Sequence, residues 1–451
     1  MRCDGVHPTC GQCARAGRSE DCEYTNGQRR ARVEILQESI RQVESRIYDL
    51  EHPHQQQPVV RLHQPYEPAP SRISSPRKCW VSFTLWFSTG LTLPRINTFL
   101  SYSSEFGFFL NGTRFRESSL IRQPIGHHER PTAALLSVVY LCALRLTQDP
   151  QLVTHEPTFL SRALKFASQG LSSTHPQKVL HNLQAEILLA YYFFACGRFV
   201  EGKYHTATAV SLGLSSGLHL VRSSTAPSSN LLLRPQDAIE EGERIHACWI
   251  VITLDMAWAV AQGENPNLDH QQQNSAVDTP WPLEMGDYAK GLFSPTARYS
   301  NTLHKFVNNI STSDTGMSTI AMFSKASILW QRADSFGREW SPDLAQTQSR
   351  NFQSAFAALD RLIDGFRAAL IPPKRIPSPT PAMTRALVVA HSIAHIATIQ
   401  LYNSKPLQGD ANARRKRLSA ANVVLNIIVT IPLQHFAFIN PIMGTVWLLA
   451  C

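Results

Sequence analysis

The chain has 451 residues, of which 43% are hydrophobic, so it is long enough to bury a sizeable core in more than one domain. Its net charge of +9 favours acidic partners such as nucleic acid, although mild basicity alone is a weak clue. No uninterrupted apolar run reaches the roughly 20 residues of a membrane-spanning helix, and the first residues lack the pattern of a signal peptide. We therefore expect no membrane partner and no secretion.

Residues 1–28 contain four of the nine cysteines and few large apolar side chains. A segment of this kind cannot form a core, so a bound metal is its usual stabiliser. Zinc takes thiolates in tetrahedral sets, and a C-x2-C step lets two sulfurs converge on one ion. The predicted zinc ligands are Cys3, Cys10, Cys13 and Cys22. The alternative is that these cysteines have no metal role.

Residues 29–51 carry an apolar residue at alternating spacings of three and four, which is the heptad pattern of a coiled coil. The apolar positions are Val33, Leu36, Ile40, Val43, Ile47 and Leu50. This narrow stripe predicts a two-stranded coiled coil and hence a homodimer. The alternative is an amphipathic helix that packs on the rest of the chain.

A short basic stretch lies between the cysteines and the heptads. It contains Arg29, Arg30 and Arg32, whose guanidinium groups are suited to DNA phosphates and carry no base specificity. The alternative is the solvated start of the helix.

Residues 52–78 are rich in Pro, Gln, His and Ser, which predicts a disordered linker. From residue 80 to residue 451 the apolar residues follow the period of a helix, and strand-like alternation is largely absent. Helices are expected over residues 133–146, 179–196, 206–220, 238–262, 317–332, 352–370, 383–402 and 411–431. Helix-breaking residues predict loops over 223–235, 264–315, 333–350 and 371–381. The predicted fold is mostly α: a small metal-bound segment, a short coiled coil and a large all-α domain.

The spacing Cys3-x6-Cys10-x2-Cys13-x8-Cys22, with Asp4-Gly5 after the first cysteine, resembles the fungal binuclear zinc-cluster domain. The four cysteines match the third to sixth cysteines of that family. The first two cysteines and the basic segment that begins the DNA-reading helix have no counterpart. The resemblance implies a chain that is N-terminally truncated at Met1. It also implies at most one bound Zn²⁺ in place of two, and weakened binding to double-stranded DNA.

The helical region carries a second resemblance, to the fungal-specific transcription factor regulatory domain. It rests on residues 99–120 and 183–268. The most specific segments of the second range are 184–190, 209–214, 217–219, 243–249 and 254–255, which follow one another in the family's order. Only Arg244 remains of the run of arginines that the family often has before its tryptophan. The resemblance implies an all-α regulatory domain that responds to a small-molecule effector and is truncated at Cys451.

Together these features predict a zinc-dependent, dimeric, DNA-binding transcription factor that regulates RNA polymerase II genes in the nucleus of a fungus. One alternative is a fragment that dimerises but does not read DNA. A further alternative is an all-α small-molecule-binding protein or enzyme, for which no catalytic constellation is found.

Three motif matches are interpreted as structural. The Gly213-x-Ser215-x-Gly217 sequence resembles a nucleophile elbow but follows a predicted helix, where that motif needs a strand. His391 and His395 are four residues apart in an apolar segment and are expected to be core or groove histidines, with a zinc-binding pair as the alternative. The basic run 414–417 is expected to lie on a surface helix, with a nuclear-import signal as the alternative.

Overall fold

The structure is a computed structural model. It describes residues 4–19, 22, 40–41, 44, 89–147, 149–224, 232–268, 276–294, 296–312, 314, 316–339, 346–371, 380–403, 409–430, 436 and 438–451. The chain divides into two compact units, residues 1–79 and residues 80–451. Each unit is described here by itself.

In the first unit, the described secondary structure is one short helix, α1 (Gly11–Arg15), together with helical residues at 40–41 and 44. The side chain of Cys10 caps α1 by accepting a hydrogen bond from the backbone N–H of Cys13. All other described side chains around α1 are exposed or half-buried, so the segment has no apolar core in the part that the structure describes.

The second unit is built of helices, and the predicted mostly-α fold is confirmed. In its described residues the only β-type pairing is an isolated bridge between Ser223 and Tyr299. The longer helices are α4 (Thr89–Ser101), α5 (Gly112–Ser119), α6 (Ala133–Arg145), α8 (Glu156–Gln169), α9 (Lys178–Ala195), α10 (Phe199–Ser215), α11 (Ala238–Ala261), α14 (Thr319–Glu339), α15 (Gln346–Ala369), α16 (Pro381–Tyr402), α17 (Ala411–Thr430) and α18 (Ile442–Ala450). Shorter elements are α7 (Pro150–Val153), α12 (Met285–Ala289), α13 (Thr302–Val307) and the 3-10 turns η2 (Ser103–Phe106), η3 (Gly170–Ser172) and η4 (Leu218–Leu220).

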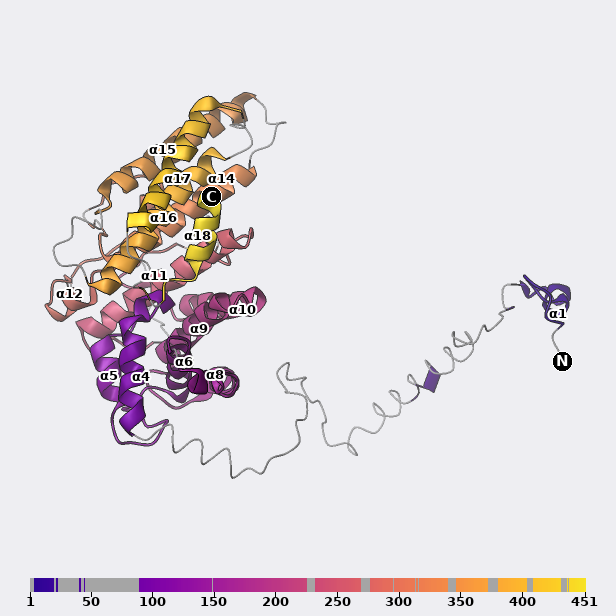
Figure 1. Cartoon of the computed structure of the whole chain (residues 1–451), viewed down its shortest axis with the longest axis horizontal. Helices are drawn as coiled ribbons and strands as arrows, with labels where there is room; N and C mark the ends of the chain where they lie inside the picture. The colour runs from indigo at the N-terminus through magenta and orange to yellow at the C-terminus, as the bar shows by residue number, and fades with distance from the viewer. Residues whose placement is uncertain are drawn as a thin grey trace. The chain divides into compact units, whose positions relative to one another are not determined.

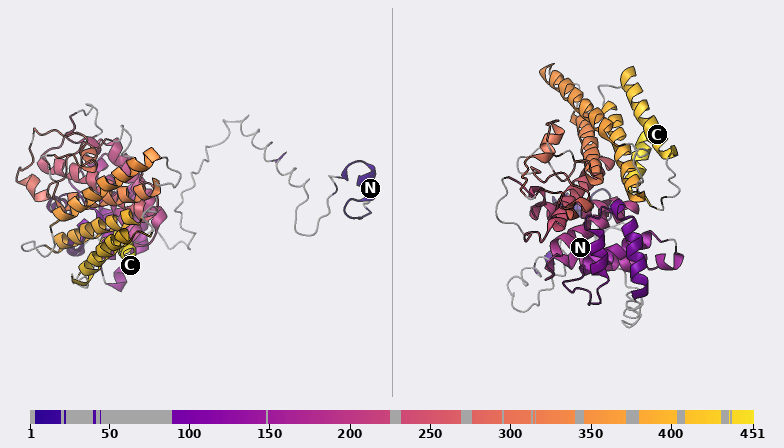
Figure 2. Two further views of the ribbon diagram at one scale, coloured as in Figure 1. Left: turned by 90° about the horizontal axis from the view of Figure 1, so that it is seen from above. Right: turned by 90° about the vertical axis from the view of Figure 1, so that its left-hand side faces the viewer.

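Helix α11 lies between two groups of helices (Figures 1 and 2). On one side α8, α6, α9 and α10 pack in succession, and α10 contacts α11. On the other side α11 contacts α14, which packs on α16, and α16 packs on α17. The hydrophobic core therefore runs through the unit with α11 at its centre.

The central position of α11 explains its sequence. Twenty of its 24 residues are buried, so it is buried on every side, where a surface helix would bury only one stripe. Asp237 begins the helix by accepting a hydrogen bond from the backbone N–H of Glu240 at 2.9 Å. One of the largest fully buried side chains is Trp249, whose ring stacks on Trp281 with 3.9 Å between ring centroids.

The expectation that no segment is long and apolar enough to cross a membrane was too strict. Helices α11 and α16 both pass that test, with a mean hydropathy of 1.3 over their most apolar windows. Those windows are 94% and 72% buried inside the unit, as in the core helices of many water-soluble proteins. Two such helices are weak evidence of a membrane span because their apolar surfaces already contact other helices.

Most predicted helices are present, with shifted ends. Helix α10 begins at Phe199, seven residues before the predicted start, and ends at Ser215, where Gly217 adopts a left-handed conformation with φ of 73°. The predicted loop 333–350 was wrong in part, because α14 continues to Glu339 and α15 begins at Gln346. The predicted loop 264–315 contains the short helices α12 and α13. Local propensity misplaced these ends because packing against the core decides where a helix stops.

Candidate metal centre

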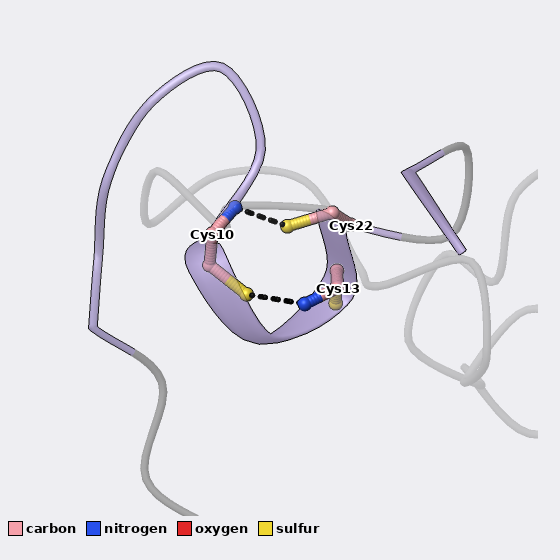
Figure 3. Close-up of side chains that lie close together, drawn as sticks. All are labelled: Cys10, Cys13 and Cys22. Carbon is pink, nitrogen blue, oxygen red and sulfur yellow. Dashed lines mark hydrogen bonds between the residues drawn. The ribbon is translucent and has the colours of Figure 1, made fainter. Parts of the chain in front are cut away.

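Three of the four predicted zinc ligands lie together around α1. The sulfur atoms of Cys10, Cys13 and Cys22 all lie within 4.8 Å of one another, and Figure 3 shows their side chains grouped at the short helix. The fourth predicted ligand, Cys3, lies outside the described residues. The structure therefore brings together cysteines that are up to twelve residues apart in the sequence.

Backbone hydrogen bonds hold two of these sulfurs in place. The Sγ atom of Cys22 accepts a hydrogen bond from the N–H of Cys10 at 3.2 Å, and the Sγ atom of Cys10 accepts one from Cys13 at 3.4 Å (Figure 3). Both are hydrogen bonds of the kind that stabilise a thiolate, because they direct N–H groups at sulfur.

Asp4 fixes the turn that precedes α1. Its two carboxylate oxygens accept hydrogen bonds from the N–H of Gly11 at 3.1 and 3.0 Å. A side chain at position 11 would place its Cβ atom 2.5 Å from a carboxylate oxygen of Asp4, so the exposed Asp4 side chain would have to shift. The hydrogen bonds to Gly11 give Asp4 a specific role, which is to hold the start of α1.

The three thiols affect one another electrostatically. The pKa of Cys13 is raised to about 12, chiefly by hydrogen bonding with Cys10 and Cys22. Three thiolates this close repel one another unless a cation lies between them, and a bound divalent cation reverses that effect.

The donor set fits zinc. In a tetrahedral site with Zn–S bonds of about 2.3 Å, sulfurs lie about 3.8 Å apart. Three sulfurs within 4.8 Å of one another are close to that arrangement before any adjustment. They would supply three ligands of a tetrahedron and leave one position, for which Cys3 is the nearest candidate in the sequence. This is the only group of three or more metal-binding side chains found among the described residues.

The other predicted sites of the first unit are mostly outside the described residues. Arg29, Arg30 and Arg32 lie there, as do Val33, Leu36, Val43, Ile47 and Leu50. Ile40 is described: it is helical and its side chain is 56% exposed. The predicted phosphate contacts and the predicted coiled coil are therefore untested.

In the second unit, three of the segments that carry the second resemblance meet at residues 107–111, namely 99–120, 184–190 and 243–249. Gln184 on α9 accepts a hydrogen bond from the N–H of Phe109 at 2.7 Å and donates one to the carbonyl of Gly107 at 3.1 Å. Glu243 on α11 accepts one from the N–H of Asn111 at 2.7 Å, and burial raises its pKa to about 7. Buried polar side chains thus tie an irregular segment to two core helices.

Gly107 has to be glycine in this arrangement. Its φ of 64° is left-handed, and a Cβ atom would lie 2.8 Å from the ring of Tyr191. The polar residues that the sequence motif singles out therefore have a structural role, which is to seat residues 107–111 between α9 and α11.

Each of the three motif matches interpreted as structural lies in a helix of the second unit or at its end. Ser215 ends α10, and the residue before it is helical, so the strand that a nucleophile elbow needs is not there. His391 bonds through Nε2 to the carbonyl of Ile371 at 2.9 Å, and burial lowers the pKa of His395 to about 3. In the run 414–417, the Nζ atom of Lys416 lies 3.2 Å from a carboxylate oxygen of Asp360 on α15. Arg414 in the same run is exposed.

Comparison with known proteins supplies one match. The sequence model of the fungal specific transcription factor domain matches residues 97–364, which is more than half of the chain. No match to a curated protein or to a solved structure was found. The matched residues run from α4 to α15 and include the segment 107–111 and the two helices that hold it.

Proposed function

Because the chain belongs to the family of proteins with the fungal specific transcription factor domain, we propose that it is a zinc-dependent, DNA-binding regulator of transcription. It acts as a dimer in the nucleus, on genes transcribed by RNA polymerase II. The domain that defines this family is a regulatory domain of transcription factors, and the family is not one of enzymes.

One observation carries this proposal. Cys10, Cys13 and Cys22 converge in the same chain as the regulatory domain. A segment without an apolar core gains its fold from a metal, and a metal-folded segment is a common way to present basic side chains to DNA. We assign residues 1–28 to this zinc segment, 29–51 to dimerisation, 52–78 to a linker and 80–451 to regulation.

The metal is tested by measuring zinc in the purified full chain. We expect one zinc ion per chain, held by Cys10, Cys13, Cys22 and Cys3, since four thiolates complete one tetrahedron. The variant Cys13→Ser should retain less than a tenth of that zinc. Cys451→Ser, which removes an exposed cysteine far along the sequence, should retain all of it. Two tightly bound ions per chain, or none, would contradict the assignment.

DNA binding is tested by titrating the full chain onto duplex DNA at several salt concentrations. We expect affinity that falls as salt rises, because arginine–phosphate contacts release counterions. Removal of zinc with a chelator should abolish the binding. Equal affinity with and without zinc would show that the cysteine segment does not contribute.

Dimerisation is tested by analytical ultracentrifugation. Ile40→Asp places a charge in the predicted apolar seam and should convert dimer to monomer at micromolar concentration. Glu44 is also exposed and lies outside the apolar heptad positions, so Glu44→Gln should leave the dimer unchanged. A monomeric wild-type chain would refute the dimer.

A further inference from the structure

An open pocket of about 600 Å³ lies where the end of α10 meets the start of α11. Its lining comes from the turn 216–223, from residues 232–237 and from α11. Its volume is in the range of sites that bind small organic molecules, about 300–1,000 Å³. Four arginines line it, namely Arg222, Arg234, Arg244 and Arg298.

Arg244 is the buried member of this group, with 8% of its surface exposed. Its Nη2 atom donates a hydrogen bond to Glu240 at 2.6 Å. Its Nε atom is buried and has no hydrogen-bond partner among the residues that the structure describes. A buried N–H donor without a partner is costly, so the Nε atom gives this side chain capacity for a further acceptor.

Backbone hydrogen bonds between residues 222–224 and Tyr299 hold Arg222 in place. It has a φ of 60°, a left-handed conformation that is unfavourable in a residue other than glycine. Its carbonyl accepts a hydrogen bond from the N–H of Tyr299 at 2.9 Å, and the N–H of Ser224 donates to the carbonyl of Tyr299 at 3.1 Å. This pairing also brings Arg298, the neighbour of Tyr299, to the same pocket.

The charges of the lining do not cancel. The guanidinium of Arg222 donates two hydrogen bonds to Glu241, one of them at 2.8 Å, so that pair is neutral. Asp237 is paired with Arg114 from outside the pocket at 2.7 Å, and Arg244 is paired with Glu240. Arg234 and Arg298 are exposed and form no ion pair with a described residue. Two positive charges are left over, next to a buried arginine whose Nε donor has no partner among the described residues.

We propose that this pocket binds a small organic dianion or trianion, a molecule with two or more carboxylate or phosphate groups. Arg244 donates to one acidic group from the buried side, and Arg234 and Arg298 pair with a second group from the exposed side. Arginine suits this role because its planar fork matches both carboxylate and phosphate oxygens. That the molecule is an effector of transcription rests on the proposed function; that it binds does not.

The test is isothermal titration calorimetry of the full chain at constant ionic strength, with citrate and with inorganic pyrophosphate as probes. We expect saturable binding of at least one probe, with one site per chain and a Kd below about 1 mM. The probe that binds identifies whether the pocket prefers carboxylate or phosphate.

Two double variants with the same change in charge locate the site. Arg234→Gln with Arg298→Gln should weaken binding at least tenfold. Arg122→Gln with Arg361→Gln removes two exposed arginines from other parts of the domain and should leave the Kd unchanged. Arg244→Lys keeps the charge but loses the planar fork, and should also weaken binding tenfold.

The proposal is overturned if neither probe binds saturably, or if both double variants weaken binding equally, which would show an effect of net charge alone. The rim variants keep the test decisive if Arg244→Lys does not fold, because their side chains are exposed. Failure here is distinguishable from failure of the proposed function, because neither zinc content nor DNA affinity is measured in this experiment.

Discussion

Residues 4–22 and the helical unit of residues 80–451 have opposite sources of order. Around α1 the only fully buried apolar side chain that the structure describes is Cys10, and Val6 is 58% exposed. In the helical unit, α11 alone buries twenty residues. A segment without apolar burial cannot offset its conformational entropy, whereas the apolar surface that a core helix buries does offset that cost. The two regions should therefore respond to different perturbations, and each can be disrupted without the other.

The largest effect is expected from removing a metal ligand, which should change the first region and leave the helical unit unaffected. Structural zinc contributes an apparent free energy of about 10–16 kcal/mol in small zinc-folded peptides. Cys10→Ser should therefore abolish zinc binding and expose the amides of residues 4–19 to rapid hydrogen exchange. The melting temperature of the helical unit should not change. A parallel fall in that melting temperature would show that the two regions are energetically coupled.

The next largest effect is expected from replacing a side chain at the centre of the core. Trp249 is completely buried, and its Nε1 atom donates a hydrogen bond to the carbonyl of Pro280 at 2.6 Å. Trp249→Ala should lower the free energy of unfolding by about 3–5 kcal/mol, as measured by urea denaturation. Val200 is 81% exposed, so Val200→Ala should change it by less than about 0.5 kcal/mol. Zinc content should stay the same in both variants; a loss of zinc in Trp249→Ala would contradict the separation.

A buried ion pair joins distant parts of the helical unit. Glu105 accepts hydrogen bonds from Arg385 on α16 at 3.0 Å and from the N–H of Asn440 at 3.0 Å. Arg385→Met should cost about 3 kcal/mol of unfolding free energy, because it leaves a buried carboxylate without its cation. Adding Glu105→Gln should recover part of that loss, since the remaining partner is then neutral. If the double variant is no more stable than Arg385→Met, the ion pair does not contribute to the free energy of unfolding as proposed.

The smallest effect is a pH dependence confined to the helical unit. Burial lowers the pKa of His246 to about 4, and its Nε2 atom bonds to the carbonyl of Leu283 at 2.7 Å. The unfolded chain binds the proton near pH 6.5, so the stability that neutral His246 contributes is full above that pH. It is lost as pH falls towards 4, by about 2 kcal/mol at pH 5.

Urea denaturation at pH 7 and pH 5 checks this sign. His246→Gln should show a smaller loss between the two pH values than the wild-type chain. His304→Gln, which changes an exposed histidine on α13, should show the wild-type loss. Equal losses in all three proteins would mean that His246 does not titrate on unfolding.

Much of the architecture was predictable from local pattern. The helices around Ala133–Arg145, Lys178–Ala195 and Ala238–Ala261 were predicted within one residue at each end, because a long apolar period of 3.6 identifies a helix on its own. Asp237 marks the start of α11 by the same local chemistry. The helix ends at Phe199, Glu339 and Gln346 were not predictable, because contacts with other helices set them.

The candidate sites divide in the same way. The cysteine spacing by itself determined that Cys10, Cys13 and Cys22 would lie close, because few residues separate them and turns connect them. Only the tertiary structure decided that Glu105 would meet Arg385, 280 residues away, and that Arg298 would line a pocket with Arg244. No local pattern encodes such pairs, because the energy that joins them is gained only after the core has brought their helices together.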